Sequence, residues 1–257
     1  MGLALTVLGA SCAAPNPNGA NAGYLVVGGG ARLLLDCGSG VAGRLRAFGQ
    51  VTDLDAILVS HLHPDHYLDL VTFRQVITYF LPPRARPLPV FLPPGGLDLL
   101  ERLGRAVGGD PGWFAGAFDL AEYEPRGTLR FGALTVHLRP VQHYIPSHAM
   151  RLEAAGRVLV YSSDLAPCAA IVEHARGANL LLCEAALFRP GDDRPDPAQR
   201  GHTAPEEAGA IARDAGVERL LLTHYALAPD QAARLDAVRA RFAGPVAWAE
   251  EGQTYPV

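Results

Sequence analysis

The feature that most constrains this chain is the segment Ser-His-Leu-His-Pro-Asp-His at residues 60–66. It follows residues 55–59, a short apolar run, β-branched in part, that is typical of a buried strand. Alternate side chains of an extended chain point to the same side, so His61 and His63 face one way. Pro64 ends the extension, because proline suits the first position of a helix. Two histidines are thus presented together at the carboxyl end of a strand.

The helix expected over residues 65–79 turns Asp65 and His66 away from the first pair. A carboxylate and a third histidine then serve a second centre beside the first. The spacing His-x-His-x-Asp-His at the end of a strand therefore predicts a site for two metal ions. Imidazole and carboxylate ligands together favour zinc, with manganese(II) or iron(II) as alternatives.

Composition and charge exclude several other functions. With 257 residues, 49% of them hydrophobic and 19% charged, we expect one globular domain over residues 1–257. All 22 basic residues are arginine, which excludes Schiff-base chemistry and the lysine of P-loop sites. A net charge of −4 disfavours a broad nucleic-acid-binding surface. The cysteines lie far apart and no apolar run has the length of a membrane span, so we expect a cytoplasmic protein with free thiols and no membrane partner.

A two-metal site needs more than four ligands, so further ones should lie at the ends of other strands. Three residues meet this expectation, each after an apolar run that reads as a strand: His143, Asp164 and His224. One such residue alone would carry little weight, but three in this arrangement support the same site.

With these motifs, the chain resembles the metallo-β-lactamase superfamily, whose signature is His-x-His-x-Asp-His. Within the superfamily it is most similar to the branch of ribonuclease Z and related phosphodiesterases. The resemblance extends from Gly9 to His224 and implies an α/β fold, the four-layer αββα sandwich of two sheets packed between helices. Asp164, in Ser-Ser-Asp, separates the chain from secreted β-lactamases, which commonly have cysteine near this place.

The resemblance also assigns roles to the ligands. It implies a first divalent ion held by His61, His63 and His143, a second held by Asp65, His66 and His224, and Asp164 as a bridge. Asp65 would in addition orient the attacking hydroxide. Asp36, in the loop after strand 31–35, would support the metal-binding loop by holding the other nitrogen of a ligand histidine, with a plain turn carboxylate as the alternative.

A second pair of residues concerns the type of reaction. Glu184 ends an apolar strand and His202 directly precedes the pattern Thr-x-x-Glu, a capping box with Thr203 as the N-cap of a helix and Glu206 as its partner. By the same resemblance, His202 would be the general acid that protonates the leaving oxygen and Glu184 its partner. The carboxylate raises the proton affinity of the imidazole and the helix N-terminus lowers it, and the sequence leaves the balance open.

Hydrophobic periodicity and turn residues predict the other elements. Strands are expected over residues 3–8, 23–27, 31–35, 88–92, 129–130, 134–138, 151–153, 158–162, 179–183, 219–223 and 246–249. Helices are expected over residues 97–107, 167–176, 205–215 and 230–242, and residues 113–124 are ambiguous. The proline-rich residues 81–96 predict a rigid connection, with Arg84 and Arg86 facing a substrate as the alternative.

Two cations about 3.5–4 Å apart lower the pKa of the water between them, so hydroxide exists near neutral pH. The first hypothesis is therefore a phosphodiesterase in which this hydroxide attacks a small or cyclic phosphodiester. The alternative is a ribonuclease Z-type tRNA 3′ endonuclease, but the chain lacks a basic, glycine-rich arm and has only 20 residues between His143 and Asp164. Thioesterase, lactonase or sulfatase activity and a non-enzymatic metal-binding sensor are further alternatives. The resemblance is also compatible with a homodimer.

Overall fold

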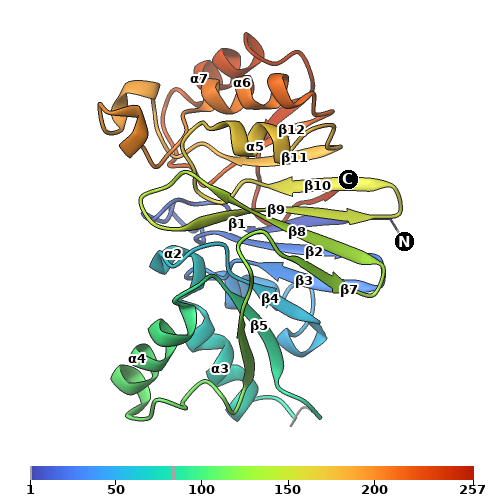
Figure 1. The fold of residues 1–257 in the computed structure, drawn as a ribbon, viewed down its shortest axis with the longest axis vertical. Helices are drawn as coiled ribbons and strands as arrows, with labels where there is room; N and C mark the ends of the chain where they lie inside the picture. The colour runs from blue at the N-terminus through green and yellow to red at the C-terminus, as the bar shows by residue number, and fades with distance from the viewer. Residues whose placement is uncertain (1, 83–84) are drawn as a thin grey trace.

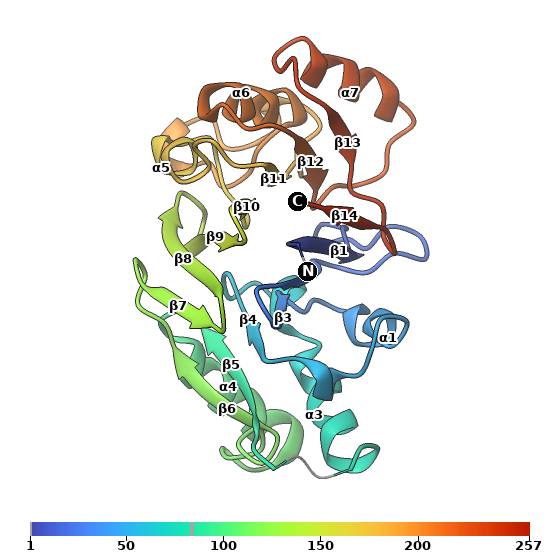
Figure 2. The same cartoon turned by 90° about the vertical axis from the view of Figure 1, so that its right-hand side faces the viewer.

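The computed structural model describes residues 2–82 and 85–257, and its strands form two seven-stranded sheets (Figures 1 and 2). The first sheet, in the order β14-β1-β2-β3-β4-β5-β6, contains β1 (Ala4–Gly9), β2 (Gly23–Gly28), β3 (Ala31–Leu35), β4 (Ala56–Leu58), β5 (Leu88–Leu92), β6 (Phe118–Glu122) and β14 (Thr254–Pro256). The second, in the order β13-β12-β11-β10-β9-β8-β7, contains β7 (Thr128–Phe131), β8 (Leu134–Val141), β9 (Ser147–Ala154), β10 (Arg157–Tyr161), β11 (Leu180–Glu184), β12 (Leu220–Thr223) and β13 (Val246–Trp248).

Helices cover the outer face of each sheet, which gives four layers (Figure 1). The first sheet carries α1 (Val41–Leu45), α2 (Pro64–Tyr67), α3 (Leu70–Tyr79) and α4 (Gly96–Gly108). The second carries α5 (Ala169–His174), α6 (Pro205–Ala215) and α7 (Gln231–Arg239). The predicted four-layer αββα sandwich is confirmed.

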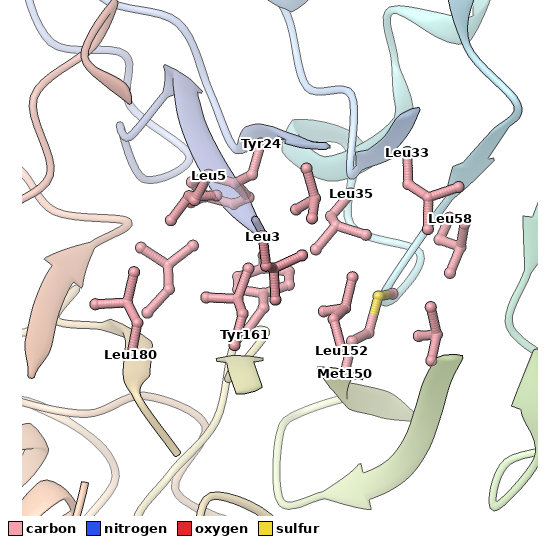
Figure 3. Close-up of a cluster of buried hydrophobic side chains, with 14 of the residues drawn as sticks. Leu3, Leu5, Tyr24, Leu33, Leu35, Leu58, Met150, Leu152, Tyr161 and Leu180 are labelled. Carbon is pink, nitrogen blue, oxygen red and sulfur yellow. The ribbon is translucent and has the colours of Figure 1, made fainter. Parts of the chain in front are cut away.

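The four layers enclose three apolar cores. The central core lies between the sheets, where Leu5, Tyr24 and Leu35 of the first sheet meet Leu152 and Tyr161 of the second (Figure 3). A second core lies between the first sheet and its helices, and a third lies between the second sheet and its helices. Alternate side chains of a strand enter opposite cores, which explains why the central strands are apolar on both faces.

The direction of the strands determines where their end residues lie. β3 and β4 are parallel, and so are β10, β11 and β12. β8 and β10 are both antiparallel to β9, so they run the same way. The carboxyl ends of parallel strands meet at one edge of a sheet, where ligands commonly bind in α/β proteins. The predicted ligands follow these ends.

Several predicted elements differ from the structure in their bounds. The single helix expected over residues 65–79 is wrong, because α2 ends at Tyr67 and α3 begins at Leu70. Asp69 lies between the two helices, and its carboxylate accepts hydrogen bonds from the amide of Ala42 (2.7 Å) and the hydroxyl of Thr72 (3.2 Å). This carboxylate ties the junction of α2 and α3 to α1.

The strands predicted over 134–138 and 151–153 are parts of the longer β8 and β9, and the ambiguous residues 113–124 contain β6. Arg84, one of the two arginines considered for substrate contact, lies outside the described residues. Among the helices of the described residues, none combines the length and the apolar character that a membrane span requires.

Candidate metal centre

The first group of predicted ligands comes from both sheets. His61 and His63 follow β4, and His143 follows β8. The Nδ1 atom of His63 lies 3.1 Å from His61 Nε2 and 3.1 Å from His143 Nε2. Asp164, after β10, places its Oδ2 atom 3.7 Å from His61 Nε2. The donor atoms of these four residues lie within 4.8 Å of one another, a spacing that one metal ion can span.

The second group lies directly beside the first. His224, after β12, places its Nε2 atom 3.1 Å from Asp65 Oδ2 and 3.3 Å from His66 Nε2. The Oδ2 atom of Asp164 is 3.4 Å from both His66 Nε2 and His224 Nε2. Asp164 therefore contacts both groups, and the structure brings all seven predicted ligands into one cluster.

Contacts on the far side of the rings orient two of these imidazoles. His143 Nδ1 donates to the carbonyl of Gly201 (2.6 Å), and His66 Nδ1 donates to Oδ2 of Asp36 (2.8 Å). In each ring Nδ1 then carries a proton, and Nε2 is the nitrogen that faces the cluster. Metal-binding histidines typically have their second nitrogen held in this way.

The electrostatics of the cluster require positive charge. Asp164 is buried, and its Oδ1 atom has no hydrogen-bond partner among the described residues. A buried carboxylate oxygen without a donor costs free energy. Burial lowers the pKa of His66, but the carboxylates of Asp164 and Asp36 outweigh it and raise the pKa well above the usual value. Burial holds the pKa of His61 well below its usual value, so its ring is in the neutral form that binds metals. This donor set fits a pair of divalent ions of the zinc type.

Asp36 supports the cluster from the carboxyl end of β3. Its side chain is fully buried and accepts four hydrogen bonds, from the amide and hydroxyl of Ser60 (2.6 and 2.7 Å), the hydroxyl of Tyr161 (2.6 Å) and His66 Nδ1 (2.8 Å). One carboxylate thus joins the start of the histidine segment, the second sheet and a predicted ligand. These contacts are more than a turn carboxylate would make.

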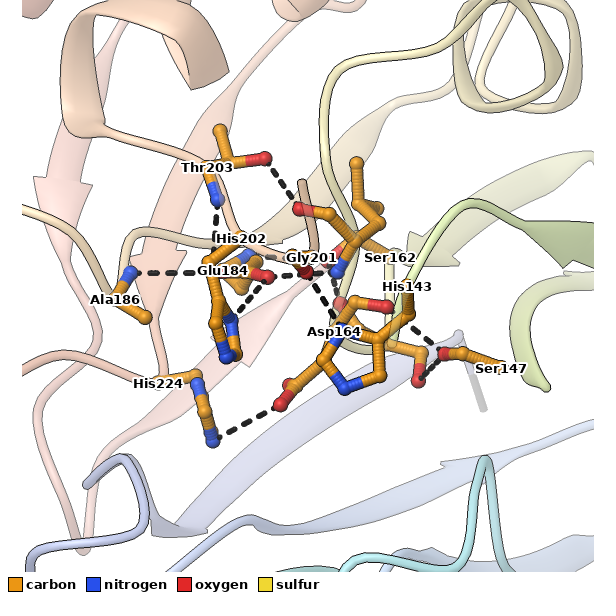
Figure 4. Close-up of polar contacts among 12 residues, drawn as sticks. His143, Ser147, Ser162, Asp164, Glu184, Ala186, Gly201, His202, Thr203 and His224 are labelled. Carbon is orange, nitrogen blue, oxygen red and sulfur yellow. Dashed lines mark hydrogen bonds and ion pairs between the residues drawn. The ribbon is translucent and has the colours of Figure 1, made fainter. Parts of the chain in front are cut away.

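Glu184 and His202 form a pair at the edge of the cluster (Figure 4). Oε1 of Glu184 accepts from His202 Nδ1 (3.0 Å) and from the amide of Leu165 (2.6 Å), while Oε2 accepts from the amides of Ala186 (3.1 Å) and Thr203 (3.3 Å). Burial lowers the pKa of His202, but the charge and hydrogen bond of Glu184 outweigh it and raise the pKa to about 9. The balance that the sequence left open therefore favours the carboxylate.

The capping box predicted beside His202 is wrong by one residue. The N-cap of α6 is Ala204, whose amide donates to Oε2 of Glu207 (3.0 Å). Thr203 is buried instead, and its hydroxyl donates to the carbonyl of Leu165 (2.6 Å). The hydroxyl joins the segment before α6 to the segment after β10, so a tertiary contact replaces the local cap.

A cavity of about 510 Å³ opens beside the cluster. Its polar lining consists of His63, Asp65, Asp164, His202 and His224. The rest of the lining is neutral and mostly apolar: Cys12, Ala13, Ala14, Pro64, Tyr144, Ala186 and Leu187. A substrate in this cavity would contact both groups of ligands and the free nitrogen of the histidine that Glu184 holds.

Two contributors to the site, Asp193 and Tyr144, were not predicted. Oδ2 of Asp193 accepts from the amides of Gly201 (2.8 Å) and His202 (3.0 Å), and Oδ1 accepts from the hydroxyl of Tyr144 (2.5 Å). Burial would raise the pKa of Asp193, but the bonds from Tyr144 and from neighbouring amides lower it to about 2. The only sequence signal is that Tyr144 is adjacent to His143.

Comparisons with known proteins agree with this fold. The model of the beta-lactamase superfamily domain matches residues 31–225. An uncharacterised protein of Mycobacterium tuberculosis is 35% identical over 94% of this chain and 88% of its own length. A ribonuclease Z of Mycolicibacterium paratuberculosis is 34% identical over 94% of each chain. The crystal structure of the metallo-beta-lactamase fold protein YhfI from Bacillus subtilis superimposes with a TM-score of 0.86 at 26% identity, over 98% of this chain and 99% of that one.

The fold and the cluster of histidines and aspartates define a metallo-hydrolase scaffold with a site for divalent ions. The chain belongs to the metallo-β-lactamase superfamily.

Proposed function

We propose that this chain is a dinuclear metal-dependent phosphodiesterase that acts on a small or cyclic phosphodiester. The observation that carries the proposal is the convergence of seven metal-ligand side chains beside a histidine whose Nδ1 is held by a buried glutamate. The ligands suit two divalent ions, and the histidine suits protonation of a leaving oxygen. Hydrolysis of a thioester or a lactone would use the same ions, and a comparison of substrates separates these reactions from phosphodiester hydrolysis.

The ligand side chains would hold the ions as two neighbouring groups. His61, His63 and His143 form the first, Asp65, His66 and His224 form the second, and Asp164 contacts both. When bound, two divalent ions, with zinc as the first choice, supply charge that polarises the phosphoryl group and lowers the pKa of a nearby water.

The residues of the chain itself would direct the attack and the departure. Asp65 lines the cavity and would accept a hydrogen bond from the attacking water, which fixes its orientation. His202 donates its Nδ1 proton to Glu184, so its Nε2 faces the cavity and would deliver a proton to the leaving oxygen. Glu184 stays in place because three backbone amides also donate to it.

The second candidate is a ribonuclease Z-type tRNA endonuclease, which the 34% identical relative of that name favours. Between His143 and Asp164, however, the chain consists mainly of β9 and β10, which are parts of the second sheet. No arginine of the described residues lines the cavity. A long RNA would have few cations to meet here, since phosphate contacts dominate RNA affinity.

The test compares substrates under one metal condition. Zinc-loaded protein should contain close to two ions per chain and hydrolyse bis-p-nitrophenyl phosphate only in the metal-loaded form. In a panel of cyclic nucleotides, short RNA and precursor tRNA, we expect the highest kcat/KM with a cyclic or other small phosphodiester. Preference for precursor tRNA would support the second candidate, and activity on thioesters or lactones alone would refute both.

A further inference from the structure

The residues that line the cavity are of two chemical kinds, and those other than the metal ligands and His202 have no assigned role. Six of these are Cys12, Ala13 and Ala14 from the loop after β1, Tyr144 after His143, and Ala186 and Leu187 after β11. We call these six residues the neutral wall. They carry no charged side chain, although they adjoin a cluster rich in carboxylates and imidazoles.

Hydrogen bonds hold one side of the neutral wall in place. Asn16 lies in the same loop as Ala13; its Nδ2 donates to the carbonyl of Tyr225 (2.9 Å), and its Oδ1 accepts from the amide of Leu227 (2.8 Å). Glu251 accepts from the amide of Ala20 (3.1 Å) near the end of that loop. The loop is therefore fastened near its middle to the segment after β12, and near its end to the turn between β13 and β14.

The opposite side is fastened as firmly. The amide of Leu187 donates to the carbonyl of Thr203 (3.2 Å). The carbonyl of Leu187 accepts from the guanidinium of Arg234 (2.8 Å). The hydroxyl of Tyr144 donates to Asp193 (2.5 Å). A Cβ on Gly201 would lie 2.5 Å from the ring of Tyr144, so only glycine allows this close packing. The neutral wall is thus preformed, as binding pockets for small molecules usually are.

Charge sets a limit on what the cavity can accept. Two divalent ions bring four positive charges, and Asp65 and Asp164 offset two of them, so an anionic phosphodiester is matched at the cluster. Apart from the His202 imidazole, which Glu184 holds, no basic side chain of the described residues lines the rest of the cavity. Arg194 lies at 4.7 Å from the centre of the Tyr144 ring and does not line the cavity. A second phosphate on the substrate would be desolvated without a partner, which is unfavourable.

We propose that the neutral wall binds the uncharged, largely apolar group of a phosphodiester that carries one negative charge, an aromatic group of up to nucleoside size. This inference rests on the proposed function and specifies its substrate class. The cavity of about 510 Å³ has the size of pockets that enclose a single small molecule. Neutral apolar contacts select such a group, and the absence of arginine from the described lining disfavours substrates with further phosphates.

Binding is measured first, without chemistry. Methyl(phenyl)phosphinate and dimethylphosphinate are monoanions that have no ester bond to hydrolyse and differ only in the group offered to the neutral wall. In calorimetric titrations of the zinc-loaded protein, we expect the phenyl compound to bind at least about tenfold more tightly. Leu187→Arg should abolish this preference, whereas Leu97→Arg, which adds the same charge at an exposed leucine of α4, should retain it. Equal affinities in the unmodified protein would overturn the proposal.

Hydrolysis then tests the charge limit. Thymidine 5′-(p-nitrophenyl phosphate) is compared with the same compound bearing a 3′-phosphate; in both, water forms the new bond to phosphorus and p-nitrophenolate leaves. We expect the extra phosphate to lower kcat/KM at least about tenfold, and Leu187→Arg to reduce or reverse this effect while Leu97→Arg does not.

The two failures are distinguishable. If zinc-loaded protein releases no p-nitrophenolate from either thymidine compound or from bis-p-nitrophenyl phosphate, the proposed function falls and this inference falls with it. If both thymidine compounds react equally well, or the extra phosphate accelerates the reaction, only the inference is overturned.

Discussion

Replacing Asp36 should weaken one of the two metal sites and leave the other nearly unchanged. The carboxylate accepts four hydrogen bonds in a fully buried position, one of them from His66 Nδ1. His66 belongs to the group with Asp65 and His224, whereas the group of His61 does not touch Asp36 directly. Loss of a residue that orients a ligand typically costs 10- to 100-fold in metal affinity.

The choice of substitution follows from the backbone. Asp36 has φ of 55°, a left-handed conformation that asparagine adopts at a lower cost than alanine. Asp36→Asn keeps one acceptor oxygen and turns the other into a donor that faces existing donors. An unsatisfied buried donor costs about 1–3 kcal/mol, so we expect Asp36→Asn to lower the free energy of unfolding by about 2–4 kcal/mol. Asp36→Ala should cost about 1–2 kcal/mol more because of backbone strain.

The assay is a competition titration with a chromophoric zinc chelator, combined with urea denaturation of the same samples. We expect two zinc sites in both proteins, with one affinity reduced 10- to 100-fold in Asp36→Asn. Asp55→Asn is the matched control. Asp55 is exposed, and its carboxylate accepts a hydrogen bond from the amide of Arg32 (2.7 Å) and not from a predicted metal ligand. If Asp36→Asn binds both zinc ions as tightly as the unmodified protein, the supporting role of this carboxylate is refuted.

Three further predictions concern the histidine pair, its loop and acid stability. His202→Ala should keep its zinc but lose about 10²–10⁴ in kcat on a diester with an alkoxide leaving group. The loss should be far smaller when the leaving group is p-nitrophenolate, which needs no proton. Equal losses with the two substrates would remove the general-acid role. Asp193→Asn should lower kcat roughly 10- to 100-fold with zinc retained, since it holds the amide of His202, whereas Asp196→Asn in the same loop should match the unmodified protein in steady-state kinetics. Burial lowers the pKa of His174 from 6.5 to about 4. As the pH falls, the imidazole is therefore protonated in the unfolded chain before it is protonated in the folded protein. The stabilisation present above pH 6.5 is then lost as the pH falls toward 4. His174→Gln should show a smaller loss of stability in urea denaturation between pH 7 and pH 4.5, and identical pH profiles would contradict this.

The fold could be predicted largely because its strands carry a strong pattern. Buried strands such as β4 and β12 are short apolar runs, and each is followed by a residue with metal-binding chemistry. The sequence alone does not show that His143 and Asp164 meet a segment about 80 to 100 residues earlier. The resemblance to a known family supplied that step.

The parts that could not be predicted depend on tertiary contacts. Asp193 lies in a loop with Asp192 and Asp196, and nothing in the local sequence distinguishes the one carboxylate that accepts from the amide of His202. The helix N-cap moved from Thr203 to Ala204 because a buried carbonyl after β10 required the hydroxyl. In both cases the deciding partner is distant in sequence, so local patterns carry no information about it.

Backbone conformation supports the assignment of the strand ends as one functional edge. Asp36, Ser163 and His224 have φ of 55°, 56° and 51°, left-handed values that are uncommon for residues other than glycine. Each lies within two residues of the end of a strand, and each is a predicted site residue or adjacent to one. Such conformations cost of order 1–3 kcal/mol each and persist only where the surrounding structure enforces them. Extended strands would send successive side chains to opposite faces, whereas a left-handed residue turns the chain sharply and aims the next functional group at the edge. The free energy for these turns comes from the three apolar cores that hold the strands, so the packing of the sandwich and the geometry of the site are parts of one arrangement.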